Sequence, residues 1–115
     1  MSTAFTLMLD ALTKQRGVIA SLVVGADDGV TIDSNMQIGQ ESTRVAALAA
    51  SLYRKARRSA KTAGLGATGF MQLEAEAGRL CIIGSDEIVL IVVAERDANI
   101  GLIRVEMLRA TKELG

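Results

Sequence analysis

The sequence predicts a small α/β (α+β) protein whose elements follow the order α-β-β-α-β-β-β-α. Three features support this prediction: short apolar runs bounded by glycine, one long proline-free stretch of helix formers, and two terminal segments with apolar residues three and four apart. The chain has 115 residues, of which 50% are apolar. This length suits one domain, and this composition excludes a disordered chain. We therefore expect one domain over residues 1–115.

The first half of the chain predicts a helix, a hairpin and a second, longer helix. Apolar spacing favours a short amphipathic helix over about residues 3–16, which Gly17 would end. The β-branched runs at 18–25 and 30–34 are separated by an Asp-Asp-Gly turn signal, which indicates a β-hairpin. Residues 41–63 contain neither proline nor glycine and are rich in alanine, leucine, arginine and lysine, which favours one long helix.

The second half of the chain predicts three strands and a final helix. Residues 70–76 alternate between two sides, and residues 79–84 form an apolar run. Residues 87–93 are nearly all aliphatic, as expected of a central strand that is covered on both faces. Because the connections between these runs are short, we expect an antiparallel meander. Apolar residues at helical spacing over 99–114 complete the pattern.

The composition disfavours several classes of function. Thirteen basic and 13 acidic side chains give a net charge of zero, which argues against a nucleic-acid partner. The aromatic residues, Phe5, Tyr53 and Phe70, are too few for a base-stacking platform. The longest unbroken apolar run, 88–94, is too short to span a bilayer, and residues 1–12 lack the features of a signal peptide. We expect a cytoplasmic protein with no membrane insertion.

The residue types that catalysis and metal binding need are scarce. The chain has no histidine, which excludes His-dependent triads and His-ligated metal sites. Its one cysteine, Cys81, lies between two aliphatic residues and is expected to pack in the core rather than act as a nucleophile. Asp27, Asp28 and Asp33 lack the ligand pattern of a calcium loop, and turn chemistry accounts for the first two. We expect no catalytic residue, cofactor or metal.

A glycine-rich segment at residues 64–69 matches the spacing G-x-G-x-x-G. The dinucleotide-binding fingerprint requires a strand before this motif and a helix after it. Here the predicted order is reversed, so the glycines would not place a helix N-terminus on a pyrophosphate. We interpret the segment as a flexible connection from helix to strand, with nucleotide binding as a minor alternative.

The long helix predicts two surfaces. Its residues 45–50 are small and apolar on all sides, which is more than a helix on a sheet needs. We infer a contact with a second helix, most simply that of another copy; the alternative is alanine used only as an exposed helix former. The C-terminal half carries a basic face, interpreted either as a solvated surface or as a docking surface for an acidic protein, a phosphate-rich ligand or anionic lipid. This face comprises Arg54, Arg57, Arg58 and Lys61.

Three segments together carry a resemblance to a known family. They are the hairpin from Gly17-Val18 to Asp28-Gly29-Val30, the long alanine-rich helix, and the final helix opening Asn99-Ile100-Gly101-Leu102-Ile103-Arg104. Over about residues 9–114 the pattern resembles the roadblock family, which includes dynein light chains and prokaryotic regulators of Ras-like GTPases. The resemblance implies a sandwich similar to profilin and longin folds. In it, a five-stranded antiparallel sheet lies between one long helix and two terminal helices.

The resemblance also implies a homodimer. Roadblock domains pair through the long helix and the third strand, which joins two sheets into one. Without such a partner the predicted third strand would be an exposed edge. The residues that the resemblance places at the seam are Leu48, Ala49, Leu52, Tyr53 and Ala56 on the helix, and Phe70, Gln72 and Glu74 on the strand.

Three hypotheses for function follow from the residues and the resemblance. Family members bind small Ras-like GTPases, and some accelerate GTP hydrolysis by positioning the GTPase's own residues, so the first hypothesis is a homodimeric module that regulates or scaffolds such a GTPase. The second is a purely structural assembly adaptor with no GTPase partner. The third, an enzyme or small-ligand sensor on the same scaffold, is disfavoured by the missing histidine and the few aromatic residues.

Overall fold

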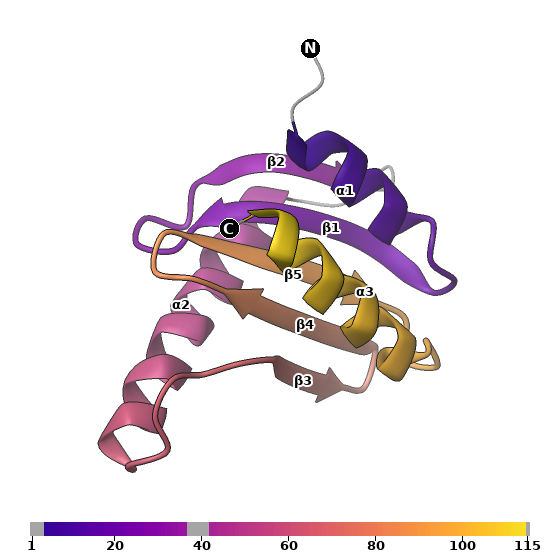
Figure 1. The fold of residues 1–115 in the computed structure, drawn as a ribbon. Coiled ribbons are helices and arrows are strands. Elements are labelled where there is room, and N and C mark those ends of the chain that lie inside the picture. The colour runs from indigo at the N-terminus through magenta and orange to yellow at the C-terminus, as the bar shows by residue number, and fades with distance from the viewer. Residues whose placement is uncertain (1–3, 37–41, 115) are drawn as a thin grey trace.

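The computed structural model describes residues 4–36 and 42–114, and it confirms the predicted order of elements (Figure 1). Each predicted element lies within a few residues of its observed bounds, because each is marked by a local pattern. The elements are α1 (Ala4–Thr13), β1 (Val18–Gly25), β2 (Thr31–Met36), α2 (Ser42–Thr62), β3 (Met71–Ala75), β4 (Gly78–Gly84), β5 (Ile88–Ala94) and α3 (Ile100–Leu114).

The five strands form one antiparallel sheet in the order β2-β1-β5-β4-β3. The hairpin β1–β2 and the meander β3–β4–β5 are as predicted. The aliphatic strand β5 lies at the centre, where it pairs with β1 on one side and β4 on the other. Its central residues, 89–92, are fully buried, which explains why this segment lacks the polar alternation of a half-exposed strand.

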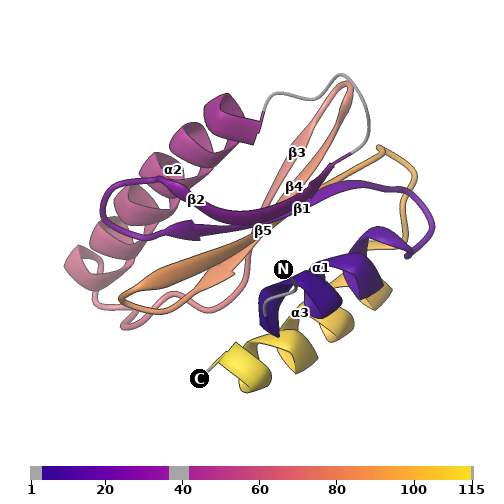
Figure 2. The ribbon, with the colours of Figure 1, turned by 90° about the horizontal axis from the view of Figure 1, so that it is seen from above.

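The helices cover the two faces of the sheet unequally. Figure 2 shows α2 on one face and α1 and α3 together on the other. Along β5, Val89 and Ile91 contribute to the core under α2, whereas Leu90 and Val92 contribute to the core under α1 and α3. The period of two in a strand thus divides one apolar run between two cores.

The turn between β1 and β2 brings the chain close to α2. Gly29 has a φ of 69°, and a Cβ at this position would lie 3.3 Å from the Cα of Ala47. The carboxylate of Asp28 accepts a hydrogen bond from the backbone N of Val30 at 2.9 Å. Both features confirm that the Asp-Asp-Gly signal forms a turn, and they explain why β2 begins one residue later than predicted.

The first glycine of the G-x-G-x-x-G segment, Gly64, caps the C-terminus of α2. Gly64 has a φ of 77°, its N donates to the carbonyl of Lys61, and the N of Leu65 donates to the carbonyl of Ala60 at 2.8 Å. These paired bonds form a Schellman cap. The segment therefore ends a helix and leads to β3, as its context predicted.

Candidate functional site

The long helix α2 uses its alanine-rich side to lie close against the protein's own sheet. Ala46, Ala49, Ala50 and Tyr53 are at most 1% exposed and pack in the core under α2. The hydroxyl of Tyr53 donates to the carbonyl of Gly84 at the end of β4, at 2.9 Å. Ala49 and Tyr53 were expected at a dimer seam. Their side chains are buried in the core of the same chain, so the seam proposed below does not include these two residues.

One flank of α2 presents the apolar residues that remain from the expected seam. Leu48 is 65% exposed, and Leu52 and Ala56 are partly exposed. The opposite flank of the helix faces the β1–β2 turn through Ala47 and Arg54. Helical periodicity therefore directs Leu48, Leu52 and Ala56 toward the β3 side of the molecule.

The sheet face next to this flank is open and apolar. The helix α2 packs mainly on β1, β2 and β5 and buries Ile82 of β4, whereas Leu80 of β4 and Leu73 of β3 on the same face stay partly exposed. A shallow hollow of about 230 Å³ lies there, and Leu73 on β3 is 47% exposed beside it. Its apolar lining includes Ile19, Leu73, Leu80 and Val93.

Strand β3 forms one edge of the described sheet, where it pairs with β4 alone. Gln72 and Glu74 are exposed on this strand, as the seam prediction requires. Phe70 precedes β3 and packs partly against the core under α1 and α3, with the Arg104 guanidinium 5.3 Å from its ring centroid. It therefore lies at the start of the edge rather than along it, because its ring finds an apolar partner inside the same chain.

The four predicted docking residues meet in one place. Arg54, Arg57, Arg58 and Lys61 line a shallow hollow of about 310 Å³ on the C-terminal half of α2, which we call the basic hollow. Their spacing of three and four residues places them on neighbouring turns of one helix.

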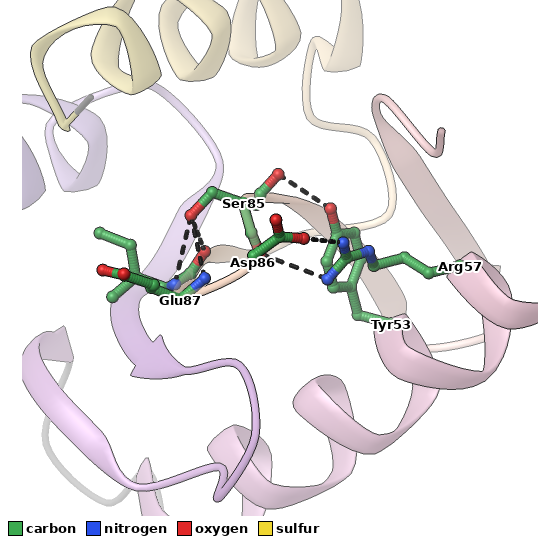
Figure 3. Close-up of polar contacts among 7 residues, drawn as sticks. Tyr53, Arg57, Ser85, Asp86 and Glu87 are labelled. Atoms are coloured by element: carbon green, nitrogen blue, oxygen red, sulfur yellow. Dashed lines mark hydrogen bonds and ion pairs between the residues drawn. The ribbon is translucent and has the colours of Figure 1, made fainter. Parts of the chain in front are cut away.

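Two of these arginines also hold loops of the protein itself. Arg54 donates to the carbonyl of Ala26 at 2.8 Å. The Arg57 guanidinium lies 5.6 Å from the centroid of the Tyr53 ring, forms an ion pair with Asp86, and has a longer contact of 3.5 Å with the carbonyl of Ser85 (Figure 3). By contrast, Arg58 and Lys61 are exposed.

Asp86 is a participant that sequence reasoning missed. It lies on the loop between β4 and β5, and its pKa is lowered by the hydrogen bond from Arg57, by the charge of Arg57 and by the more distant charge of Lys61. The only signal in the sequence was an acidic residue in a short turn. Its contact with Arg57 joins positions 29 residues apart, which no local pattern reports.

The remaining candidate groups are structural. Cys81 is fully buried, and desolvation raises the pKa of its thiol to about 11, while the charge of Arg79 acts in the opposite direction. This confirms its role in packing. Asp33 accepts a hydrogen bond from the Thr6 hydroxyl at 2.9 Å. Over residues 4–36 and 42–114, no group of three or more His, Cys, Asp or Glu side chains is arranged to hold a metal ion.

The described helices are also too short or too polar to cross a membrane. The longest, α2, carries the basic hollow on its exposed side.

Comparison with known proteins defines the class of this chain. The Roadblock/LC7 domain model matches residues 4–95. Two proteins of Methanocaldococcus jannaschii, MJ1340 and MJ0310, are each 32% identical over 103 residues, which is 90% of this chain and 90% of theirs. The chain therefore belongs to the Roadblock/LC7 family, as the resemblance indicated.

Solved structures share the fold over nearly the whole chain. A Roadblock/LC7 domain from Streptomyces avermitilis superposes with a TM-score of 0.84 at 19% identity, covering 94% of this chain and 92% of that one. Myxococcus xanthus MglB superposes with a TM-score of 0.83 at 24% identity, covering 97% and 94%. At these identities the likeness establishes the common architecture.

Proposed function

We propose that this protein is a homodimeric interaction module that binds and regulates, or scaffolds, a small Ras-like GTPase. The observation that carries the proposal is the open apolar patch around Leu73 and Leu80, which lies beside the edge strand β3 of the described sheet and an exposed apolar flank of α2. A protein that left these three apolar or unpaired surfaces bare would risk uncontrolled association, so a specific partner is expected there.

A second copy of the chain fits this surface. Antiparallel pairing of two β3 strands would join the two sheets and satisfy the backbone groups of both edges. The partner's α2 would then lie over the open face and bring its own Leu48 and Leu52 against the hollow beside Leu73. The seam proposed here comprises Leu48, Leu52, Ala56, Gln72 and Glu74, with Leu73 added from the structure.

The GTPase partner is proposed from the family, and its docking surface from charge. Membership of a family whose members bind Ras-like GTPases supports this class of partner. The basic hollow lies on the side of α2 away from the proposed seam, so a dimer would leave it accessible. Its charge suits an acidic patch on the partner, and the module would act by positioning that partner without donating a catalytic group.

The test is nucleotide-dependent capture from a lysate of the source organism. We expect the tagged protein to retain a small GTPase with a non-hydrolysable GTP analogue and to lose it with GDP. The double variant Arg58→Glu/Lys61→Glu should retain less of it, because both side chains are exposed in the basic hollow. The matched control, Arg109→Glu/Lys112→Glu, makes the same charge change on exposed positions of α3 and should bind normally.

Two outcomes would contradict parts of this account. Capture that ignores the nucleotide, or capture that yields no GTPase, would remove the regulatory function and favour the structural adaptor. Equal capture of the GTPase by the two double variants would show that the basic hollow is not part of the partner interface. It would not bear on the proposed dimer seam.

A further inference from the structure

A carboxylate from the protein itself already pairs with one of the residues that line the basic hollow. The loop of residues 85–87 carries Asp86 over α2, and Ser85 fixes this loop: its hydroxyl accepts bonds from the backbone N of Glu87 and of Ile88, each at 3.3 Å (Figure 3). Because the loop is braced in this way, the carboxylate of Asp86 is held at the Arg57 guanidinium.

The two partners of this ion pair differ in how firmly the rest of the protein holds them. The side chain of Asp86 is 89% exposed, whereas that of Arg57 is only 25% exposed. The guanidinium of Arg57 keeps the ring of Tyr53 and the carbonyl of Ser85 as neighbours after the carboxylate departs. An exposed ion pair is weak, so a competing carboxylate can replace it. A cation that is already positioned binds with less loss of side-chain freedom.

The hollow also has more positive charge than Asp86 can neutralise. Four cationic side chains line it, and one carboxylate pairs with one of them. Arg58 and Lys61 are exposed at its rim. The hollow is shallow and lies on the C-terminal half of α2, a shape that suits the surface of a macromolecule better than an enclosed small ligand.

We infer that the basic hollow is a docking site for a carboxylate-rich segment of a protein partner, and that Asp86 is an internal competitor that occupies the site in the free protein. The inference rests on the proposed function, since it assigns the chemistry and the regulation of the same docking surface. The occupant is inferred from Asp86, because its carboxylate pairs with Arg57, one of the four cations that line the hollow. A partner must displace Asp86, so its apparent affinity is reduced by the fraction of molecules in which the internal pair is closed.

The experiment measures binding of a fluorescein-labelled hexaglutamate peptide by fluorescence anisotropy at low ionic strength, with hexaglutamine as the peptide control. Asp86→Asn should bind the hexaglutamate about two- to five-fold more tightly than the wild type, the range that one exposed ion pair provides. Arg58→Glu should weaken binding by a similar or larger factor. Neither position is buried, so both variants should fold.

Glu87→Gln is the matched control for Asp86→Asn. It removes the same charge from the same loop, but the carboxylate of Glu87 points away from Arg57 (Figure 3). We expect its affinity for hexaglutamate to equal that of the wild type. An equal increase in hexaglutamate affinity in Asp86→Asn and Glu87→Gln would contradict the role of Asp86 as a competitor, because the loss of one negative charge from the loop would then explain both results.

Two further results would overturn the docking site. One is unchanged hexaglutamate binding in Arg58→Glu. The other is tight binding of inorganic tripolyphosphate by a wild type that does not bind hexaglutamate, which would assign the hollow to phosphate. The peptide assay uses neither GTPase nor nucleotide. It can therefore fail while nucleotide-dependent capture succeeds, or succeed while capture fails.

Discussion

Burial determines the chemistry of Cys81. Its thiol is fully enclosed on β4, and the pKa is raised to about 11 because the thiolate would lose its hydration there. The sequence predicted this role from the aliphatic neighbours alone. The inference worked because a free cysteine in an apolar run behaves as a small apolar residue.

The thiol of Cys81 should be inert in the folded protein. Only the thiolate reacts with disulfide reagents, and burial suppresses both its formation and its access to the reagent. We expect slow labelling by Ellman's reagent at mildly alkaline pH in the native protein and prompt labelling in guanidinium chloride. Prompt labelling of the native protein, with the circular dichroism spectrum unchanged, would show that Cys81 is accessible.

The raised pKa of Cys81 also makes the stability of the folded protein depend on pH. Between the ordinary thiol pKa of 9.0 and about 11, the unfolded chain loses a proton that the folded chain retains. The unfolded state then binds fewer protons, so the contribution of Cys81 to stability falls as the pH rises through this window.

At the scale of elements, two glycines that follow α2 allow the effect of backbone strain to be measured without an effect of steric crowding. Gly64 has a φ of 77° and no atom near the position of an added Cβ, and Gly69 also lies in open space but has no positive φ. Gly64→Ala should therefore lower the free energy of unfolding by about 1 kcal/mol through strain alone. Gly69→Ala should change it by less than about 0.5 kcal/mol. Urea unfolding of both variants measures the difference, and equal effects would show that the left-handed cap is dispensable.

Element bounds were predictable because each pattern is local, whereas the pairing of elements was not. The strands β1 and β5 pair along most of their length although about 70 residues separate them in the chain. Likewise, the sequence analysis placed both Leu52 and Tyr53 at the expected seam. It could not say which of the two faces the sheet, because that depends on the β1–β2 turn and on the carbonyl of Gly84.

The sequence predicted which residues form the basic hollow but not the contacts that these residues make with distant loops. The four cations of the basic hollow follow from helical spacing, so the sequence brought them together correctly. The contacts of Arg54 with Ala26 and of Arg57 with Asp86 come from loops that are distant in the chain. Because Arg54 and Arg57 make these contacts within the chain, substitutions at the exposed residues Arg58 and Lys61 test partner binding more directly.

At the scale of the whole molecule, the two faces of the sheet differ in how completely they are covered. Two helices enclose one face, but α2 leaves an apolar patch around Leu73 and Leu80 open on the other face. The apolar flank of α2, the open face and the free β3 edge lie together, and a second copy of the chain would cover all three. Dimerisation through this seam is therefore the central property that we propose for the molecule.

The most direct test is the mass in solution of the wild type, Leu48→Glu and Leu102→Glu, measured by size-exclusion chromatography with light scattering. Both leucines are exposed on helices, at 65% and 46%, but they lie on opposite faces of the molecule. We predict twice the 12.1 kDa chain mass for the wild type and for Leu102→Glu. Leu48→Glu should be a folded monomer, because the seam would bury its charge. A monomeric wild type, or a Leu48→Glu variant that remains dimeric, would contradict the proposed seam.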